Sequence, residues 1–409
     1  MPAVVLGIET PIGLAIIRDL GVRGVAVVGL ASGPHSIGLA SRFLSQGIIR
    51  ARGAESLLAQ LETLRNTLGE ACLFAISESD IEMLNRHRTR LAGYRFMFAD
   101  ATRMERVLNK EQTCTAAKSV GIRVPRTEKI GSLADARVLS ATLYYPVVLK
   151  WNNPNDVVKI LSNAGLALDK ARYCHSADEL LTYLTPYANV GLFPLIQEYC
   201  SGYGLAQIIL MHGGQPVYRF QHQRLHEWPP EGGFSTLCTS LGTGHHVALM
   251  DKSIALLQAL DWEGIAMVEY RHDPVNGVSA FMEINGRFWG SLPLACQAGA
   301  SFPWFCYQLL GLKQAIVEGV YVVGVRSRFM IPETKRLIRL LFESHAITDR
   351  RLTFDRSREL ASYLCEFFRA RSYYFVFAWR DPLPMFSDLF HSAANLLPAW
   401  TKRDLGRKG

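Results

Sequence analysis

Oxygen-bearing side chains meet in one short apolar stretch, FMEINGRFWGSL, which begins at residue 281. Side chains alternate in direction along a β-strand, so Glu283 and Asn285 share one face while Met282 and Ile284 turn toward a core. An earlier apolar stretch, AMVEY, carries Glu269, and the turn-forming residues of DPVNG separate the two. Pairing of the two strands as a hairpin would bring Glu269 close to Glu283 and Asn285.

Two carboxylates and an amide oxygen on one sheet face favour a bound cation, because the carboxylates otherwise repel each other. These hard oxygen ligands suit Mg²⁺, which binds through a few carboxylates together with substrate phosphates. The plainer interpretation is a pair of carboxylates on an edge strand that face water. Arg287, two residues beyond Asn285, adds a charged fork for a phosphate or a carboxylate.

Two lysines support the interpretation as a phosphate site. Lys150 ends the apolar run YYPVVLKW, where a positive charge needs an anion. Lys110 opens a predicted helix, where its charge opposes the helix dipole. A bound triphosphate would account for both positions, although either lysine alone is compatible with solvated surface.

The order of four motifs resembles a known family. PVVLKW, LIQEYCSG, AMVEY and FMEINGRFWGSLPLA follow one another as in the ATP-grasp superfamily of carboxylate–amine ligases. The chain is similar to the ATP-binding modules of biotin carboxylase and of the large subunit of carbamoyl phosphate synthetase. The resemblance covers roughly residues 1–310, and it implies ATP held between two α+β lobes.

The resemblance also implies roles for individual residues. Lys110 and Lys150 would bind phosphates, Glu198 would be the acid at the adenine hinge, and the backbone of Tyr199 and Cys200 would contact the base edge. Glu269, Glu283 and Asn285 would hold one or two Mg²⁺ ions, with Mn²⁺ as a substitute. Arg287 would steady the γ-phosphate, Arg224 would meet the carboxylate substrate, and Gly232, Gly233 and Ser235 would belong to a loop that closes over the reacting groups.

Two segments depart from the family pattern. In many members a glycine-rich hairpin after the position of Lys150 covers the phosphates, but here residues 151–173 contain a single glycine, Gly165. Lys159 is therefore expected to replace part of the phosphate contacts of that hairpin. The segment SGYGLAQ after the hinge also lacks the acid that binds the ribose hydroxyls in many members.

The predicted function is an ADP-forming ligase that activates a carboxylate as an acyl phosphate and joins it to an amine. His222 or His226 could take the proton of the amine, although a purely structural histidine fits either position. Two alternatives stay open: a carboxylase-like use of bicarbonate, without a visible biotin-carrying segment, and a non-catalytic nucleotide-binding protein. A hydride-transferring Rossmann enzyme is a more distant alternative, because the glycine pattern near Gly7 is not GxGxxG.

The pattern of strands and helices that must position these residues predicts a protein of mixed α/β and α+β class, and the family resemblance implies the ATP-grasp fold. Residues 1–98 read as a Rossmann-like domain of alternating strands and helices, residues 99–190 as the N-terminal ATP-grasp lobe, and residues 191–315 as the C-terminal lobe with the metal site. The runs LAQIILMHGGQPVYRFQHQR and GIAMVEYRHDPVNGVSAFMEING predict two hairpins in the second lobe. Residues 316–409 form a basic extension that is predicted to be mostly helical.

The composition is that of a globular protein with several domains: 409 residues, 49% hydrophobic and 20% charged. The net charge of +8 lies mostly after residue 320, where a solvated basic face competes with contact to a membrane surface or an anionic polymer. No nucleic-acid-binding module is visible, so no nucleic-acid partner is expected. The scattered cysteines and the lack of 18 consecutive apolar residues predict a cytoplasmic protein with free thiols, and a homo-oligomer stays open.

Overall fold

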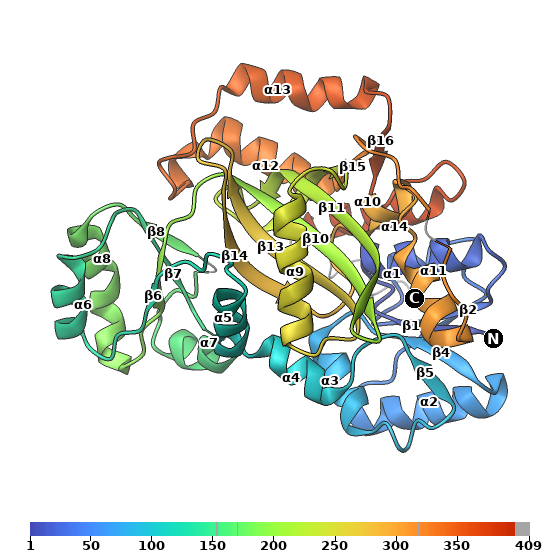
Figure 1. Cartoon of the computed structure of the whole chain (residues 1–409). Helices are drawn as coiled ribbons and strands as arrows, with labels where there is room; N and C mark the ends of the chain where they lie inside the picture. The colour runs from blue at the N-terminus through green and yellow to red at the C-terminus, as the bar shows by residue number, and fades with distance from the viewer. Residues whose placement is uncertain (153, 170, 318, 397–409) are drawn as a thin grey trace, which may run out of the picture.

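The computed structural model describes residues 1–152, 154–169, 171–317 and 319–396. Three β-sheets organise this part of the chain (Figure 1): a five-stranded sheet near the N-terminus, a four-stranded sheet in a protruding lobe, and a seven-stranded sheet between them. Basic residues Lys402 and Arg403 of the predicted extension lie outside the described residues.

The first sheet is parallel and has the order β3-β2-β1-β4-β5. Its elements are β1 (Ala3–Leu6), α1 (Pro11–Gly21), β2 (Val27–Ala31), β3 (Gln46–Ile49), α2 (Ala54–Leu68), β4 (Ala71–Phe74), α3 (Glu78–Arg86) and β5 (Tyr94–Phe96). Leu57, Leu61 and Leu64 recur at helical spacing in α2 and are buried, and Gly69 caps that helix at a φ of 71°. The structure therefore confirms a Rossmann-like layer of parallel strands and helices at the N-terminus.

The protruding lobe, shown in green in Figure 1, is built on a sheet of order β6-β9-β7-β8. Helices α4 (Ala101–Leu108) and α5 (Lys110–Ser119) lead into it. Its own elements are β6 (Thr127–Glu128), α6 (Leu133–Ser140), β7 (Val147–Lys150), α7 (Pro154–Asn163), β8 (Arg172–Cys174), α8 (Ala177–Leu184) and β9 (Leu195–Glu198). This group, residues 127–198, is called the N-terminal lobe below.

The seven-stranded sheet has the order β14-β13-β10-β11-β12-β15-β16. Both predicted hairpins are confirmed, since β10 (Tyr203–His212) pairs with β11 (Gln215–Trp228) and β13 (Gly264–Asp273) pairs with β14 (Val278–Asn285). The sheet also contains β12 (Phe234–Leu241), and α9 (Val247–Ala259), α10 (Leu292–Gln297) and α11 (Phe302–Cys306) pack beside it.

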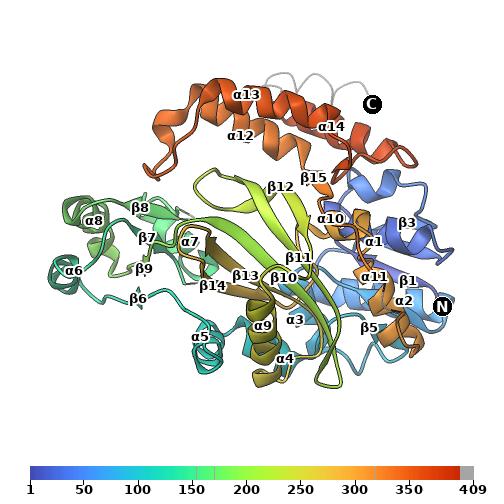
Figure 2. The same ribbon diagram turned by 45° about the horizontal axis from the view of Figure 1, so that its top comes forward.

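The C-terminal extension is helical in large part but also completes this sheet. Strands β15 (Arg326–Arg328) and β16 (Ser372–Tyr374) add to its edge beside β12, which the sequence analysis did not foresee. Helices α12 (Met330–Phe342), α13 (Arg356–Cys365) and α14 (Leu383–Leu396) form a separate layer, which Figure 2 shows above the sheet. The turn from Ser344 to Arg351 between α12 and α13 is called the strap below.

The hydrophobic cores divide the molecule unevenly. Two clusters each combine residues of the first sheet with residues of the seven-stranded sheet, for example Val5 with Phe220 and Leu6 with Val268. Two smaller clusters contain only side chains of the N-terminal lobe, among them Leu180 and Trp151. The first domain and the seven-stranded sheet therefore form one packed body, and the N-terminal lobe is attached to it.

Candidate active site between the lobes

The hairpin β13–β14 brings together the three predicted oxygen ligands. Glu269 and Glu283 are directly paired across the two strands. The side-chain amide of Asn285 donates to Glu269 Oε1 at 3.1 Å and to Glu283 Oε1 at 3.2 Å. The alternation of side chains along each strand was therefore sufficient to predict that these side chains share one face. Glu269, Glu283 and Asn285 are called the oxygen cluster below.

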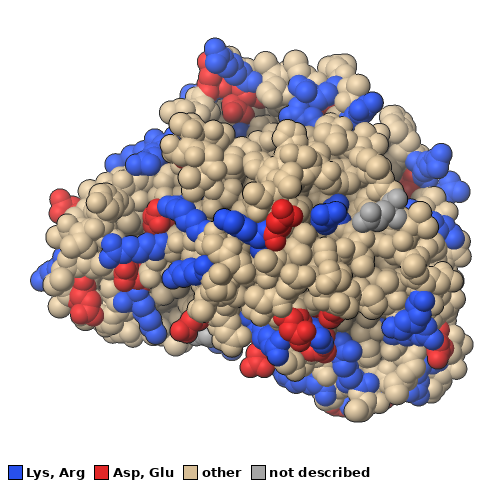
Figure 3. All heavy atoms as spheres, in the orientation of Figure 1, with Lys and Arg blue, Asp and Glu red and all other residues tan. Residues whose placement is uncertain are grey.

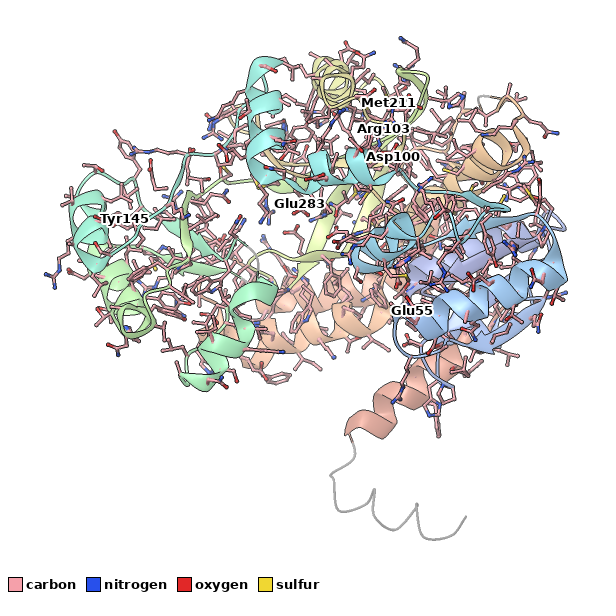
Figure 4. The ribbon with its side chains drawn as sticks, turned by 90° about the horizontal axis from the view of Figure 1, so that it is seen from below. Glu55, Asp100, Arg103, Tyr145, Met211 and Glu283 are labelled. Atoms are coloured by element: carbon pink, nitrogen blue, oxygen red, sulfur yellow. The ribbon has the colours of Figure 1, made fainter. Side chains whose placement is uncertain are left out.

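The electrostatics of the oxygen cluster favour a cation. Burial raises the pKa of Glu269, Arg224 lowers it, and the neighbouring charge of Glu283 raises it again. Glu283 is exposed, and Figure 4 shows it at the junction between the lobe that carries Tyr145 and the rest of the molecule. A cation between the two carboxylates would stabilise both charged forms.

The cluster supplies part of a magnesium site. The described part of the chain contains no group of three or more His, Cys, Asp or Glu side chains that could hold a metal ion. Two carboxylates and an amide oxygen nevertheless fit Mg²⁺, which completes its shell with water and substrate phosphates. The amide of Asn285 would have to turn its oxygen toward the ion, because its nitrogen now faces both carboxylates.

Positive charge faces the cluster from the N-terminal lobe. Lys150, at the end of β7, donates to Gln197 Oε1 at 3.1 Å and forms no ion pair described in the structure. Burial lowers its pKa, the nearby charge of Arg271 lowers it further, and Glu283 raises it. Lys150 therefore lies close to a carboxylate of the oxygen cluster while still lacking an anion of its own.

Lys110 begins α5, as predicted, and reaches toward the lobe. Its ammonium group donates to the backbone oxygen of Asn152 at 2.9 Å, just beyond the end of β7. Its charge also lowers the pKa of Lys150, so the two predicted phosphate ligands are neighbours.

The predicted adenine hinge links the N-terminal lobe to the body. Glu198 ends β9, and its carboxylate accepts from the Arg123 side chain and from the Arg126 backbone N–H at 3.1 Å. The thiol of Cys200 lies 3.6 Å from the Arg123 guanidinium. These contacts fix the end of β9, and with it the start of the segment predicted to meet the base edge, against residues 123–126.

The two predicted catalytic arginines have different surroundings. Arg224 donates to Glu269 and, at 3.3 Å, to Glu227, so its guanidinium directly contacts the oxygen cluster. Arg287 donates to Glu78 of α3 at 3.1 Å and to the backbone oxygen of Phe288 at 3.2 Å. Of the two, only Arg224 is in described contact with a predicted metal ligand.

Other predicted residues lie apart from the cluster. Lys159 is exposed on α7, the helix that stands where a glycine-rich hairpin was considered, and no described contact joins it to the cluster. His222 is fully buried against Ser291 Oγ at 2.9 Å, and burial lowers its pKa to about 3, which makes it a weak proton acceptor. His226 contacts Glu333 Oε1 at 2.6 Å.

Sequence reasoning missed Arg271 and Glu227, two charged residues beside the cluster. Arg271 lies on β13 two residues after Glu269, on the same face, and donates to Glu227 Oε2 at 2.6 Å. The alternation that identified Glu269 could have identified Arg271. The loop that contains Gly232 and Gly233 packs onto Arg271 and onto Tyr173 of the N-terminal lobe, and no local signal predicts that contact.

Comparisons with known proteins rest on the fold. No protein-family model matches the chain, and no curated protein matches it. Solved structures do: a biotin carboxylase–β-γ-ATP complex from Campylobacter jejuni has a TM-score of 0.60 at 14% identity, over 79% of this chain and 74% of that one. The L-amino acid ligase from Bacillus licheniformis has a TM-score of 0.53 at 15% identity, over 76% and 74% of the two chains.

A third enzyme agrees with these two. The N5-carboxyaminoimidazole ribonucleotide synthetase from Thermus thermophilus has a TM-score of 0.57 at 13% identity, over 79% of this chain and 81% of that one. These likenesses agree with the motif order and with the two lobes around the oxygen cluster. The chain has the ATP-grasp fold, with a Rossmann-like domain before it and an extension after it.

Proposed function

We propose that the protein is an ADP-forming, ATP-dependent carboxylate–amine ligase. The observation that carries this proposal is the oxygen cluster on β13 and β14, faced from the other lobe by Lys150, which has no ion-pair partner among the described residues. Acidic groups on one wall and basic groups on the other suit a magnesium–triphosphate substrate, because the carboxylates would bind the magnesium ion and the lysines would bind the phosphates. Similar structures include a biotin carboxylase with MgADP and bicarbonate bound.

The proposed reaction has two steps. An oxygen of the carboxylate substrate attacks the γ-phosphorus of ATP, the bond to the bridging oxygen breaks, and ADP leaves. The amine nitrogen then attacks the carbonyl carbon of the acyl phosphate, phosphate leaves, and the nitrogen loses a proton. The first step is needed because a carboxylate has no adequate leaving group, whereas an acyl phosphate releases phosphate.

The chain's own residues bind and orient the reactants. Lys110 and Lys150 would hold the phosphates and stabilise the charge of the transferring group. Glu269, Glu283 and Asn285 would hold one or two Mg²⁺ ions, or Mn²⁺, which supply positive charge to the phosphate oxygens when bound. The backbone of Tyr199 and Cys200 would meet the adenine, and Lys159 would reach a phosphate only if α7 rearranged.

The arginines have distinct proposed tasks. Arg287 would leave Glu78 and turn toward the γ-phosphate, since that ion pair is partly exposed and weak. Arg224 would keep Glu269 oriented and offer a guanidinium N–H to the carboxylate substrate. Because both arms of Arg224 are already engaged by Glu269 and Glu227, substrate binding there requires release of Glu227.

The test is ADP release by the purified protein with Mg-ATP and a panel of carboxylates and amines. We expect ADP only when an acid and an amine are both present, and loss of that signal in Glu283→Gln. The matched control is Glu55→Gln, which removes an exposed carboxylate of the first domain (labelled in Figure 4) and leaves the rate unchanged. ADP formation that persists in Glu283→Gln would contradict the proposed metal site.

The same assay, together with a direct measurement of ATP binding, separates the alternatives. ADP release with bicarbonate alone would indicate a carboxylase-like enzyme. Absence of ATP binding at millimolar Mg²⁺ would contradict the ligase and the non-catalytic nucleotide-binding protein alike. Binding without ADP release from any pair would favour the non-catalytic alternative.

Several partner assignments accompany this proposal. Small-molecule acids and amines are the proposed substrates, nucleic acid is not a proposed partner, and light scattering will show whether the chain forms a homo-oligomer. No helix within the described residues is long and apolar enough to cross a membrane. We propose a cytoplasmic location, which a fluorescent fusion would test.

A peripheral contact with a membrane surface is proposed for α14. Leu383, Phe386 and Phe390 form one stripe of that helix and are 60%, 62% and 71% exposed. Figure 3 shows Lys and Arg side chains, with Asp and Glu side chains among them, along the upper edge of the molecule, where α13 lies in Figure 1. Co-sedimentation with anionic vesicles, and its loss in Phe386→Ser, is the expected result; no sedimentation would contradict the contact.

A further inference from the structure

The strap reaches the N-terminal lobe from a distant part of the chain. His175 Nε2 lies 3.3 Å from the backbone nitrogen of Arg350 and 3.0 Å from the backbone oxygen of Thr348, and the tautomer of the ring decides which of the two it hydrogen-bonds. The Arg351 guanidinium donates to the backbone oxygen of Tyr145 at 3.2 Å. The strap therefore touches the lobe at β8 and at the entrance of β7.

The strap also holds the predicted adenine hinge. The hydroxyl of Tyr199 donates to Asp349 Oδ2 at 3.1 Å, and the Arg351 guanidinium lies 5.1 Å from the centre of the Tyr199 ring. Asp349 is only 3% exposed, and its other oxygen accepts from the backbone N–H of Arg351 at 3.0 Å. Burial, together with Asp349, raises the pKa of Tyr199 to about 12, so its hydroxyl stays a donor.

Glu231 joins the strap to the loop near the oxygen cluster. Its Oε1 accepts from the Arg339 side chain of α12 at 2.9 Å and from the backbone N–H of Thr348 at 3.2 Å. Its backbone oxygen accepts from the Tyr173 hydroxyl of β8. One buried residue thus contacts the extension and the N-terminal lobe at the same time.

These polar contacts matter because the N-terminal lobe has a core of its own. Within the described residues its hydrophobic clusters contain no residue of the body, and the edge-on ring contact between Tyr173 and Tyr199, 6.0 Å between centres, adds only limited apolar contact at its margin. Such a lobe is held by hydrogen bonds and ion pairs at its margin, which are individually weak and can be exchanged.

We infer that Asp349, Arg351 and Glu231 are positioning residues for the nucleotide site: they hold the N-terminal lobe over the oxygen cluster and set the hinge before any nucleotide binds. The C-terminal extension would thus take part in the ATP site, a role that the family resemblance over residues 1–310 does not include. The expected change in ATP affinity rests on the proposed function, whereas the expected change in lobe position does not.

The first test measures lobe position in the nucleotide-free protein. Spin labels on unnatural amino acids at Val138 of α6 and Val275 of the β13–β14 turn, both well exposed, report one distance across the lobes. We expect a narrow distance distribution in the otherwise unaltered chain and a broad one, shifted to longer distances, in Glu231→Ala/Asp349→Ala. The matched control Glu359→Ala removes a carboxylate of α13 that pairs with Arg336 and does not contact the lobe, and it keeps the narrow distribution.

A milder variant covers the case in which the double variant fails to fold. Tyr199→Phe removes only the hydroxyl that Asp349 accepts from, and we expect it to broaden the distribution to a smaller degree. A narrow distribution in both variants would overturn the inference, as would a broad one in the unaltered chain.

The second test measures ATP binding. If the double variant keeps the lobe in place for about a tenth of the time, the apparent Kd for ATP rises about tenfold, because only that fraction binds. We expect KM for ATP to follow and kcat to change little, a split that a general loss of folded protein would not produce. Failure of the unaltered chain to bind ATP would refute the proposed function and leave the distance result to decide the strap's role.

Discussion

The N-terminal lobe and the seven-stranded sheet form opposite walls of one site, and they are held in place in opposite ways. The sheet shares two hydrophobic cores with the first domain. The described cores of the lobe are separate, and the lobe meets the body mainly through polar contacts, with a ring contact between Tyr173 and Tyr199. The wall that carries the carboxylates is therefore fixed by shared packing, whereas the wall that carries Lys150 is held by contacts that can be exchanged. This division suits a reaction in which metal ligands need constant geometry while substrate must enter and product must leave.

The largest expected effect comes from the fixed wall. Glu269→Gln removes a charge from the oxygen cluster and leaves the half-buried Arg224 with one carboxylate fewer. We expect kcat for ADP formation to fall about a thousandfold, or ~4 kcal/mol of transition-state stabilisation. Steady-state kinetics with saturating ATP measures this; a loss below about tenfold would show that the cluster is not the metal site.

The two walls should also differ in how they unfold. Phe220→Ala, in the shared core, is expected to lower the free energy of unfolding of the whole body by about 3–5 kcal/mol. Leu180→Ala, in the lobe's own core, is expected to cost about 2–5 kcal/mol but to loosen the lobe alone. Hydrogen exchange by mass spectrometry distinguishes them, and faster exchange throughout the chain in Leu180→Ala would mean that the lobe is not independent.

Lys150→Met is expected to weaken function while stabilising the free protein. Burial lowers the pKa of Lys150 in the folded protein below its ordinary value of 10.5. At pH values between these two, Lys150 is protonated in the unfolded chain but not in the folded one, so unfolding takes up a proton. The stability of the unaltered protein should therefore rise with pH across that window, and the Met variant should lose this rise. Thermal melts from pH 7 to 10 measure it, and an unchanged pH slope in the variant would contradict the assignment.

The same variant should bind ATP poorly. Removal of one phosphate-binding charge is expected to raise the Kd for ATP by about tenfold to a hundredfold. Lys159→Met provides the comparison, because Lys159 is exposed on α7 and should leave the Kd almost unchanged. Equal losses in the two variants would mean that α7 rearranges to reach the phosphates.

The smallest effect is expected at the lobe's exposed margin. Arg350 forms an ion pair with Glu179 at 2.7 Å, but 69% of its side chain is exposed. Arg350→Ala should change the free energy of unfolding by less than about 1 kcal/mol and should leave the lobe distance unchanged, since the solvent screens such pairs. A broadened lobe distance in this variant would show that the exposed pair, rather than Asp349 and Glu231, holds the lobe.

The oxygen cluster was predictable because its geometry is local. Glu283 and Asn285 are two residues apart on one strand, and a short turn fixes their pairing with Glu269. The same alternation places Arg271 beside them. The motif order also indicated the ATP-grasp fold and the parallel first sheet.

The strap was not predictable, because its contacts join residues about 150 positions apart. Asp349 and Tyr199 have no pattern that relates them, and the three-residue strands β15 and β16 are too short to leave a periodic signal. Arg224 and Arg287 show a second limit. Their residue types indicated phosphate or carboxylate binding, but whether each meets a substrate or a protein carboxylate depends on the tertiary structure.

The two chain crossings of the N-terminal lobe lie side by side, since Thr127 of β6 pairs with Gln197 of β9. A segment whose two ends are adjacent and whose hydrophobic core is its own can be exchanged as a unit. Exchange of residues 127–198 for the matching segment of another protein with this fold should therefore replace the wall that carries Lys150 and leave the oxygen cluster in place. The fold therefore allows one wall of the candidate site to be exchanged while the other wall stays unchanged.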